Sequence, residues 1–262
     1  MNDFGKDYNL GLCLIEKCAS TLNVGINCFV KKGEFFERLG IKISDGWSKT
    51  SWCLDDYSTF NLSNPNIDVI ELGFKEKRMI AIVREPLDRF ISAFINKCID
   101  EEDWTESFVH CYDCHKNMSC VVERAYNRMM EISKAKHFEL DYTDRHFTPL
   151  SWYCNFKKHF AKYTLIKKES SSDGTERMLD KLELVFRERG VEEWKIDEIR
   201  NQTLSGKTHH STSHTMRRQK YEKEMFTNPY VMQTLKKMYY YDYLIFNFDT
   251  AVFDNVKLPE DY

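Results

Sequence analysis

Short apolar runs alternate with amphipathic segments along this chain. The run LGLCLI at 10–15 precedes the polar turn EKCAST and then LNVGINCFV, which can form a helix. A second apolar run, RMIAIV at 78–83, is also followed by a helical pattern. Short apolar runs bounded by turn residues are typical of buried strands, so both stretches predict a strand, a turn and a helix.

The helix after the second run has the clearest pattern. Its apolar residues stand at offsets of 0, 3, 4, 7 and 8, which places on one helical face Leu87, Phe90, Ile91, Phe94 and Ile95. Pro86 falls in the first turn, where its missing N–H costs nothing. This stretch therefore predicts an amphipathic helix with one buried face.

The remaining segments continue the alternation. Two more strands are predicted at 68–74 and 163–169, and helices at 120–135, at 176–190 with Gly190 as the stop, and from Tyr221 towards YYYDYLIFNF. Residues 33–66 are mixed and rich in loop signals. The alternation predicts an α/β fold with a central, mainly parallel sheet flanked by helices. We expect a single domain over 1–262, with a Cys-rich excursion at about 98–120.

Composition and charge narrow the class of protein. The 262 residues are 42% hydrophobic and 30% charged, which supports a globular core. The net charge of −3 disfavours a general nucleic-acid binder. We expect no membrane span, because no run of 18 apolar residues occurs, and the N-terminus does not read as a signal peptide.

The nine cysteines allow three interpretations. The cysteines could form disulfides in an oxidising compartment, bind zinc in CYDCHKNMSC, or remain ordinary thiols of a reduced protein. A zinc site is weakened by the absence of a second CxxC-like pair. Five cysteines are the candidates for disulfides, namely Cys98, Cys111, Cys114, Cys120 and Cys154. The odd count leaves at least one cysteine unpaired within the chain.

Both strand–turn–helix segments have the features of an anion site, because N–H groups at a helix start attract anions. After the first strand, Lys17 supplies a cation, and Ser20 and Thr21 supply hydroxyls. At the end of the second strand, Arg84 is followed eight residues later by Ser92, and this pair can grip one phosphate. The simpler alternatives are a capped turn and an Arg in a salt bridge.

These two stretches resemble those of a known family. IEKCAST is similar to the 5′-phosphosulfate loop of sulfotransferases, commonly Pro-Lys-Ser-Gly-Thr-Thr, and VREPLDRFISAF is similar to their 3′-phosphate motif. HFTPLSWYCNF and YYYDYLIF resemble the carbohydrate sulfotransferases, particularly a nematode-type branch of the chondroitin and HNK-1 group. The resemblance runs from Leu10 to Phe248. It implies the sulfotransferase fold, which is like that of the P-loop NTPases.

The resemblance also implies a sulfuryl donor, 3′-phosphoadenosine 5′-phosphosulfate (PAPS). Arg84 and Ser92 would hold its 3′-phosphate, and the loop would cradle the 5′ end through Lys17, Cys18, Ala19, Ser20 and Thr21. Glu16 stands where the family usually has Pro, and Ala19 where it has Gly. An Ala restricts the backbone and a Glu adds negative charge beside an anion. These departures support the alternative of an inactive glycan- or nucleotide-binding protein with the same fold.

Sulfuryl transfer to a sugar hydroxyl needs a stabilised leaving group and a general base, but no metal. Lys17 is the candidate for the first role. For the base, His146 in DRHFTPL is the first choice, and the alternative is the set His209, His210 and His214. The basic stretch THHSTSHTMRR is either a solvated loop or a loop over the cofactor or acceptor, with contributions from Thr208, His209, Thr212, Arg217 and Arg218.

The family further implies an anionic glycan acceptor, with chondroitin-like glycosaminoglycans as the first candidates. Its members act in the Golgi lumen, where disulfides form and glycans are attached. Sequons for N-glycosylation begin at Asn61, Asn117 and Asn201. We therefore expect at least one disulfide among the five candidate cysteines.

Overall fold

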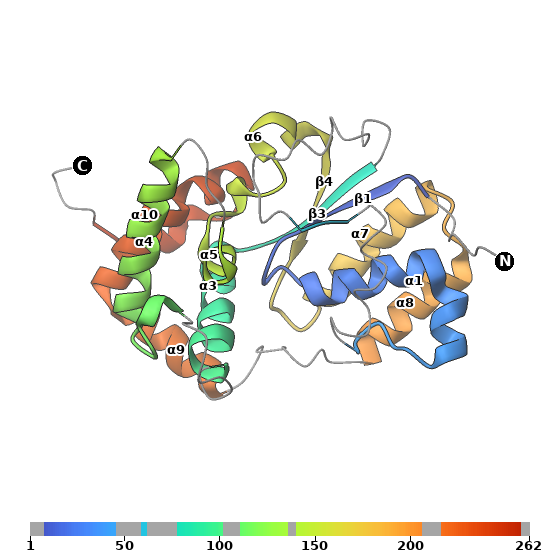
Figure 1. Cartoon of the computed structure of the whole chain (residues 1–262), viewed down its shortest axis with the longest axis horizontal. Coiled ribbons are helices and arrows are strands. Elements are labelled where there is room, and N and C mark those ends of the chain that lie inside the picture. Colours follow the sequence, from blue (N-terminus) through green and yellow to red (C-terminus); the bar gives the residue numbers. More distant parts are fainter. Residues whose placement is uncertain are drawn as a thin grey trace. The chain divides into compact units, whose positions relative to one another are not determined.

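A computed structural model describes residues 8–45, 59–61, 78–101, 111–135, 140–205 and 216–257 (Figure 1). The chain divides into two compact units. Unit 1 holds the described residues of Met1–Leu62, Ile67–Arg84 and Cys154–Ser211. Unit 2 holds those of Glu85–Tyr153 and Thr212–Tyr262.

Unit 1 contains a four-stranded parallel sheet in the order β2-β1-β3-β4. The strands are β1 (Leu10–Leu14), β2 (Thr59–Asn61), β3 (Arg78–Arg84) and β4 (Tyr163–Lys168). All five residues of β1 are buried, as are the five central residues of β3. Near-continuous apolar runs are expected for strands of a parallel sheet that is covered on both faces.

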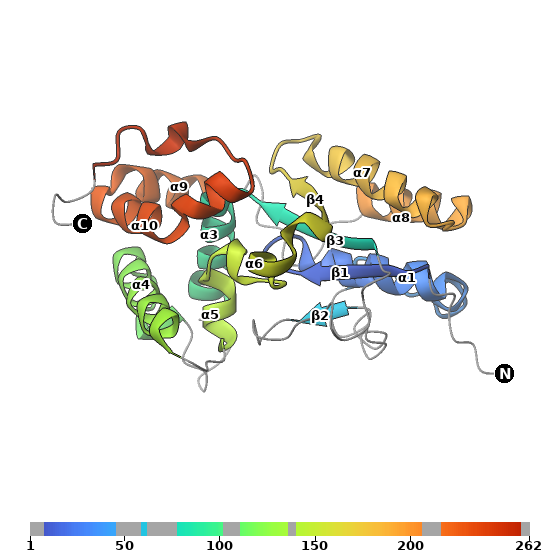
Figure 2. The same cartoon turned by 90° about the horizontal axis from the view of Figure 1, so that it is seen from above.

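The helices of unit 1 bury this sheet. They are α1 (Ser20–Leu39), α6 (Phe156–His159), a 3-10 turn η6 (Phe160–Lys162), α7 (Gly174–Glu188) and α8 (Glu193–Ser205). Figure 2 shows α7 beside β4, and α8 packs against both α7 and α1. One apolar core joins the inner faces of α1, α7 and α8 to the strands, with Phe29, Ile82, Ile166, Leu179 and Ile199 among its members.

Unit 2 is helical in its described part. Its elements are α3 (Pro86–Phe94), a π-helix η3 (Ile95–Asp100), η4 (Cys111–Asp113), α4 (Met118–Lys134), α5 (Tyr142–Phe147), η5 (Leu150–Trp152), α9 (Met216–Thr227), α10 (Pro229–Ile245) and η7 (Thr250–Phe253). The predicted apolar face of α3 is buried in a second core. That core includes Phe90, Phe94, Val122, Leu235 and Tyr243.

Three disulfides are present among the described residues. They join Cys13 to Cys154, Cys98 to Cys111 and Cys114 to Cys120. The expectation of a disulfide in the cysteine-rich region is therefore confirmed. Cys18 is buried and keeps its thiol. Within the same described residues, no group of three or more His, Cys, Asp or Glu side chains is placed to hold a metal ion.

Most predicted elements are confirmed, including the strands at β1, β3 and β4 and the mainly parallel sheet with its flanking helices. The helix expected from Tyr221 is instead two helices, because Pro229 starts α10 directly after α9. Residues 33–39, expected to be mixed, continue α1 until Gly40 ends it with φ 63°. The strand predicted at 68–74 lies outside the described residues. Across the described part, no helix has the length and apolar character that a membrane crossing requires.

Candidate functional site

The loop between β1 and α1 has an unusual backbone. Lys17 and Ala19 both have left-handed conformations, with φ of 66° and 59°. Ala19 is the residue before α1 and makes no side-chain cap hydrogen bond. A hydrogen bond from α1 stabilises the loop, because the side-chain amide of Asn23 donates from Nδ2 to the carbonyl oxygen of Cys18 at 3.3 Å. The first turn of α1 therefore begins directly after the loop, and the side chain of Ala19 does not cap its backbone N–H groups.

Ala19 occupies the position where the similar family motif has Gly. A left-handed conformation costs a non-glycine residue about 1–2 kcal/mol, because its Cβ crowds the following carbonyl oxygen. Glycine adopts it without that cost. The left-handed conformation at this position gives a physical reason for a Gly there, and in this chain an Ala adopts it.

Arg84 stands at the carboxyl end of β3 and is half-buried. Its Nη1 donates to the carbonyl oxygen of Lys17 at 3.2 Å, and its Nη2 donates to the hydroxyl of Ser170 at 2.9 Å. Ser170 follows β4 by two residues. One side chain therefore links the loops that follow three neighbouring parallel strand segments, at β1, β3 and β4.

Positive charge gathers at this edge of the sheet. Arg84 pairs in register with Lys168, whose ammonium group donates to the carbonyl oxygen of Glu169 at 2.7 Å and to the hydroxyl of Thr175 at 3.1 Å. Burial lowers the pKa of neighbouring Lys167, and repulsion from Lys181 lowers it further. In open parallel sheets, ligands bind outside the carboxyl ends of the strands. This edge is accordingly suited to an anionic ligand.

Ser92 lies within α3 and is 3% exposed. It belongs to unit 2, whereas Arg84 is the last residue of its segment in unit 1. Only Glu85 separates β3 from α3 along the chain, and its carboxylate caps the helix by accepting from the amide of Asp88 at 2.5 Å. The joint contact of Arg84 and Ser92 with one phosphate stays a prediction.

His146 lies on α5, a short helix whose N-terminus is capped by side chains. Asp141 and Asp144 form a reciprocal capping box, with the Asp144 amide donating to the Asp141 carboxylate at 2.7 Å. Asp144 also accepts from Arg128 at 3.2 Å. Burial is the largest cause that raises the pKa of Asp144, and Asp141 raises it further, while Arg128 opposes the shift. These contacts fix α5 and with it the direction of the imidazole.

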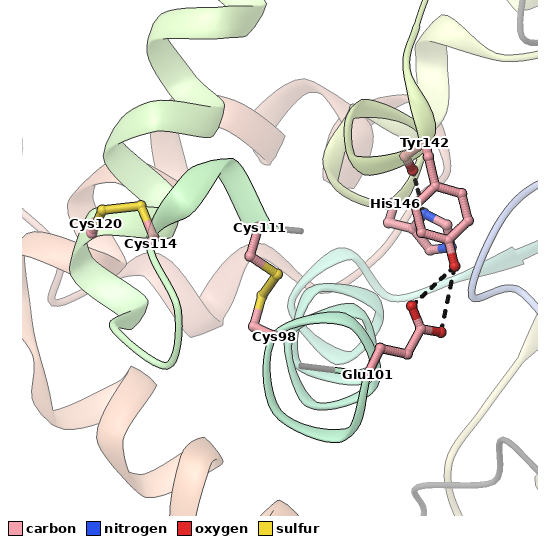
Figure 3. The surroundings of a disulfide bond; sticks show 7 residues. All are labelled: Cys98, Glu101, Cys111, Cys114, Cys120, Tyr142 and His146. Carbon is pink, nitrogen blue, oxygen red and sulfur yellow. Dashed lines mark hydrogen bonds between the residues drawn. A yellow bond between two sulfur atoms is a disulfide. The ribbon is translucent and has the colours of Figure 1, made fainter. Parts of the chain in front are cut away.

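The ring of His146 has a defined tautomer. Its Nδ1 lies 2.6 Å from the carbonyl oxygen of Tyr142, which can only accept a hydrogen bond (Figure 3). Nδ1 must therefore carry the proton, and in the neutral ring Nε2 carries the lone pair. His146 is 6% exposed, and the Tyr142 ring lies 4.8 Å from it between centroids. This arrangement suits a base that accepts a proton at Nε2.

A polar cluster adjoins this histidine. The Tyr142 hydroxyl accepts from the ammonium group of Lys97 and lies 3.1 Å from the carboxylate of Glu101, while Lys97 and Glu101 form an ion pair. Figure 3 shows the Tyr142 hydroxyl directed at Glu101, near the Cys98–Cys111 disulfide. Lys97 belongs to η3. The π-helix thus supports the residue that flanks His146.

The segment after His146 is fastened by buried polar groups. Arg89, 1% exposed, donates to the carbonyl oxygen of Thr148 at 2.7 Å and to that of Arg145 at 3.0 Å. Asp242 accepts from the amides of Leu150 and Ser151 at 2.5 and 3.0 Å. The motif HFTPLSWY is therefore a fixed turn, whose structural anchors come from α3 and α10.

The basic stretch THHSTSHTMRR lies only partly within the described residues. Thr208, His209, His210, Thr212 and His214 all lie outside the described residues. Arg217, at the start of α9, forms an ion pair with Asp100, and Arg218 pairs with Asp88 and Glu222. These pairs tie the start of α9 to α3 and η3. A direct substrate contact by Arg217 stays a prediction.

Sequence reasoning missed Ser170 and the cluster around Tyr142. Ser170 follows a predicted strand in SSSDG, and its place at the carboxyl end of a parallel strand is the signal that could have found it. The cluster carried no comparable signal, because Lys97, Glu101 and Tyr142 are brought together only by the packing of η3 against α5.

Comparisons with known proteins agree with this geometry. A model described as "Sulfotransferase family" matches residues 3–249. The chain is 32% identical to Carbohydrate sulfotransferase chst-1 of Caenorhabditis elegans over 247 residues, which covers 93% of this chain and 74% of that protein. It is 28% identical to the uncharacterized C. elegans protein C18B2.2 over 244 residues, or 92% and 67% of the two chains. No solved structure matches the chain.

Proposed function

This chain belongs to the sulfotransferase family, and from that premise we propose that it transfers a sulfuryl group from PAPS to a hydroxyl of a glycan. The observation that carries the proposal is the position of Arg84 at the carboxyl edge of the sheet in unit 1. There Arg84 contacts both the Lys17 loop and Ser170, at the carboxyl ends of parallel strands. We keep the expectation that residues 1–262 act as one sulfotransferase domain.

The residues at this edge fit the donor. The left-handed loop at Lys17 to Ala19 and the first turn of α1 suit the 5′-phosphosulfate, and the Arg84 guanidinium suits the 3′-phosphate. Cys18, Ser20 and Thr21 line the loop in this assignment, and Ser92 keeps the role predicted from its spacing to Arg84.

The reaction moves one proton and one sulfuryl group. The sugar hydroxyl loses its proton to Nε2 of His146 as its oxygen forms a bond to sulfur. The bond between sulfur and the bridging oxygen breaks, and that oxygen keeps the electron pair. Lys17 stabilises the charge that grows there, which makes adenosine 3′,5′-bisphosphate a better leaving group. The Tyr142 carbonyl, which holds the proton on Nδ1, supports Nε2 as the accepting atom.

The acceptor in this proposal is an anionic glycan, with chondroitin-like chains first. A carbohydrate acceptor is supported by the name of the relative chst-1, and the chondroitin preference rests on the motifs HFTPLSWYCNF and YYYDYLIF. Arg and Lys side chains would attract such a chain electrostatically.

We place the enzyme in the Golgi lumen, where the three disulfides among its described residues would be stable. A glycan at Asn117 fits that compartment. Asn117 is exposed, and its Oδ1 accepts from the amide of Cys120 at 3.1 Å to cap α4. A glycan would be attached to Nδ2, so the cap would persist in the glycoprotein.

The test is a transfer assay with PAPS labelled in its sulfuryl group, run over a panel of glycosaminoglycans that includes chondroitin, dermatan and heparan chains. We expect label in chondroitin-like acceptors. Label in another glycan alone would correct the acceptor but retain the enzyme class. Tight binding of adenosine 3′,5′-bisphosphate with no transfer to any acceptor would favour the inactive binding protein instead, for which Glu16 and Ala19 are the supporting residues.

A further inference from the structure

We propose that Ser170 is an additional ligand of the donor's 3′-phosphate and acts as one unit with Arg84. This inference rests on the proposed function, because it concerns the same nucleotide. It starts from the hydrogen bond that Arg84 Nη2 donates to Ser170 Oγ at 2.9 Å. No motif of the sequence pointed to this serine as a ligand.

The sheet places Ser170 at the correct edge. β3 and β4 are parallel, and their register pairs Arg84 with Lys168. The chain therefore leaves β4 beside the point where it leaves β3, and Ser170 comes two residues later. Ser170 is half-buried, in contrast to the exposed Ser171 and Ser172. Ser170 accepts a hydrogen bond from Arg84, and this contact fixes the position of its hydroxyl.

The turn that carries Ser170 is tightly built. A Cβ added to Gly174 would lie 2.3 Å from the carbonyl oxygen of Glu169, so the turn closes on the end of β4 more closely than another residue would allow. Arg177 on α7 ties the turn together through contacts with Glu169, Asp173 and Ser171. A ligand on such a turn is preorganised, which reduces the entropy lost on binding.

The chemistry of the pair suits a phosphate. A hydroxyl has one donor and two acceptor lone pairs, so a serine that accepts from a guanidinium can still donate its own proton to an anion. Arg84 and Ser170 can then offer N–H and O–H donors side by side to one phosphate. Ser170 also helps to orient the guanidinium, because it accepts from Nη2 while the Lys17 carbonyl oxygen accepts from Nη1.

The test measures binding of adenosine 3′,5′-bisphosphate by calorimetry, with adenosine 5′-monophosphate as the ligand without a 3′-phosphate. We expect Ser170→Ala to weaken the bisphosphate at least tenfold and to leave the monophosphate unchanged. Ser170→Thr, which keeps the hydroxyl, should retain most of the affinity. Ser172→Ala, an exposed serine of the same turn, is the matched control and should bind like the wild type.

A double-mutant cycle tests whether the two residues act together. Arg84→Ala should weaken bisphosphate binding strongly, and adding Ser170→Ala should weaken it little further. Arg78→Ala, at the other end of β3, controls for loss of an arginine from that strand. Equal affinities of Ser170→Ala and Ser172→Ala would overturn the proposal, as would equal weakening of both nucleotides by Ser170→Ala. If the wild type binds no bisphosphate, the proposed donor is wrong, and this inference fails with it.

Discussion

Arg84 holds the backbone of Lys17: its Nη1 donates to the Lys17 carbonyl oxygen over 3.2 Å, across 67 positions of sequence. The two residues follow neighbouring strands of one parallel sheet. Because the carbonyl group of Lys17 is tied inward in this way, the left-handed turn at φ 66° is stabilised by a contact from outside the loop. Arg84 thus supports the shape of the loop that we propose to bind the donor, as well as supplying charge.

The first prediction concerns Lys17. We expect Lys17→Ala to lower turnover by about 100-fold or more with a smaller loss of donor binding, because charge on the bridging oxygen is largest in the transition state. Steady-state kinetics and calorimetry with adenosine 3′,5′-bisphosphate separate the two effects. Lys42→Ala, which changes an exposed lysine of the same unit, should leave both unchanged. An equal loss in binding and turnover would mean that Lys17 stabilises the bound donor only.

The second prediction concerns His146. We expect His146→Ala to lower turnover by roughly 100-fold to 10,000-fold, the usual contribution of a general base. The wild-type turnover should fall at acid pH, where the base is protonated, and the variant should lack this acidic limb. His115→Ala, an exposed histidine, is the control. If His146→Ala keeps full turnover and a substitution at His209, His210 or His214 removes the limb, the base lies in the late loop.

The third prediction concerns Ala19. We expect Ala19→Gly to raise the midpoint of thermal unfolding by a few degrees, because relief of about 1–2 kcal/mol of left-handed strain exceeds the entropy cost of glycine, about 0.5–1 kcal/mol. Ala161→Gly, at an exposed position without a positive φ, should lower the midpoint. Differential scanning calorimetry measures both midpoints. A lower midpoint for Ala19→Gly would mean that the Ala19 side chain contributes packing that outweighs the strain.

The sequence predicts some elements of the fold and not others. The strands at LGLCLI and RMIAIV were predictable because buried parallel strands are short apolar runs bounded by turn residues, and the helix at Leu87 because a one-faced helix has its own period. The short helix α5 was missed, since six residues are too few to show a helical period, although its capping box is visible in the sequence. The partnership of Ser170 with Arg84 was beyond reach, because it depends on strand order and register, which periodicity does not report.

The fourth prediction uses the buried carboxylate of Asp242. Burial raises its pKa, although two backbone amides and Arg89 oppose the shift. A raised folded-state pKa means that the folded state binds more protons than the unfolded state between the two pKa values. The stability that Asp242 contributes is therefore greatest below the ordinary carboxyl pKa, about 3.9, and falls as pH rises through the raised value.

We accordingly expect Asp242→Asn to destabilise the protein by about 1–3 kcal/mol, since the Leu150 and Ser151 amides donate to different carboxylate oxygens and Asn would set its Nδ2 donor against one of them. The difference from the wild type should shrink as pH rises from 4 to 7. Urea unfolding at several pH values measures this, with the exposed Asp254→Asn as control. A difference that grows with pH would contradict a raised pKa.

The fifth prediction ranks two disulfides. The Cys13–Cys154 bond spans 141 residues and the Cys114–Cys120 bond spans 6. In the loop-entropy model these spans correspond to about 5 and about 2 kcal/mol. We therefore expect Cys13→Ala with Cys154→Ala to lower the free energy of unfolding more than Cys114→Ala with Cys120→Ala. Chemical unfolding without reductant measures both, and equal losses would show that constraint of the unfolded chain is not the main effect.

The Cys13–Cys154 bond also has a topological consequence. It closes the backbone from residue 13 to residue 154 into a covalent ring that contains both Lys17 and Arg84. A single proteolytic cut anywhere inside that ring opens it without releasing a fragment, so the nicked protein keeps its full mass until the disulfide is reduced. The segment that carries Lys17 therefore stays attached to the segment that carries Arg84 even after the backbone between them has been cut once.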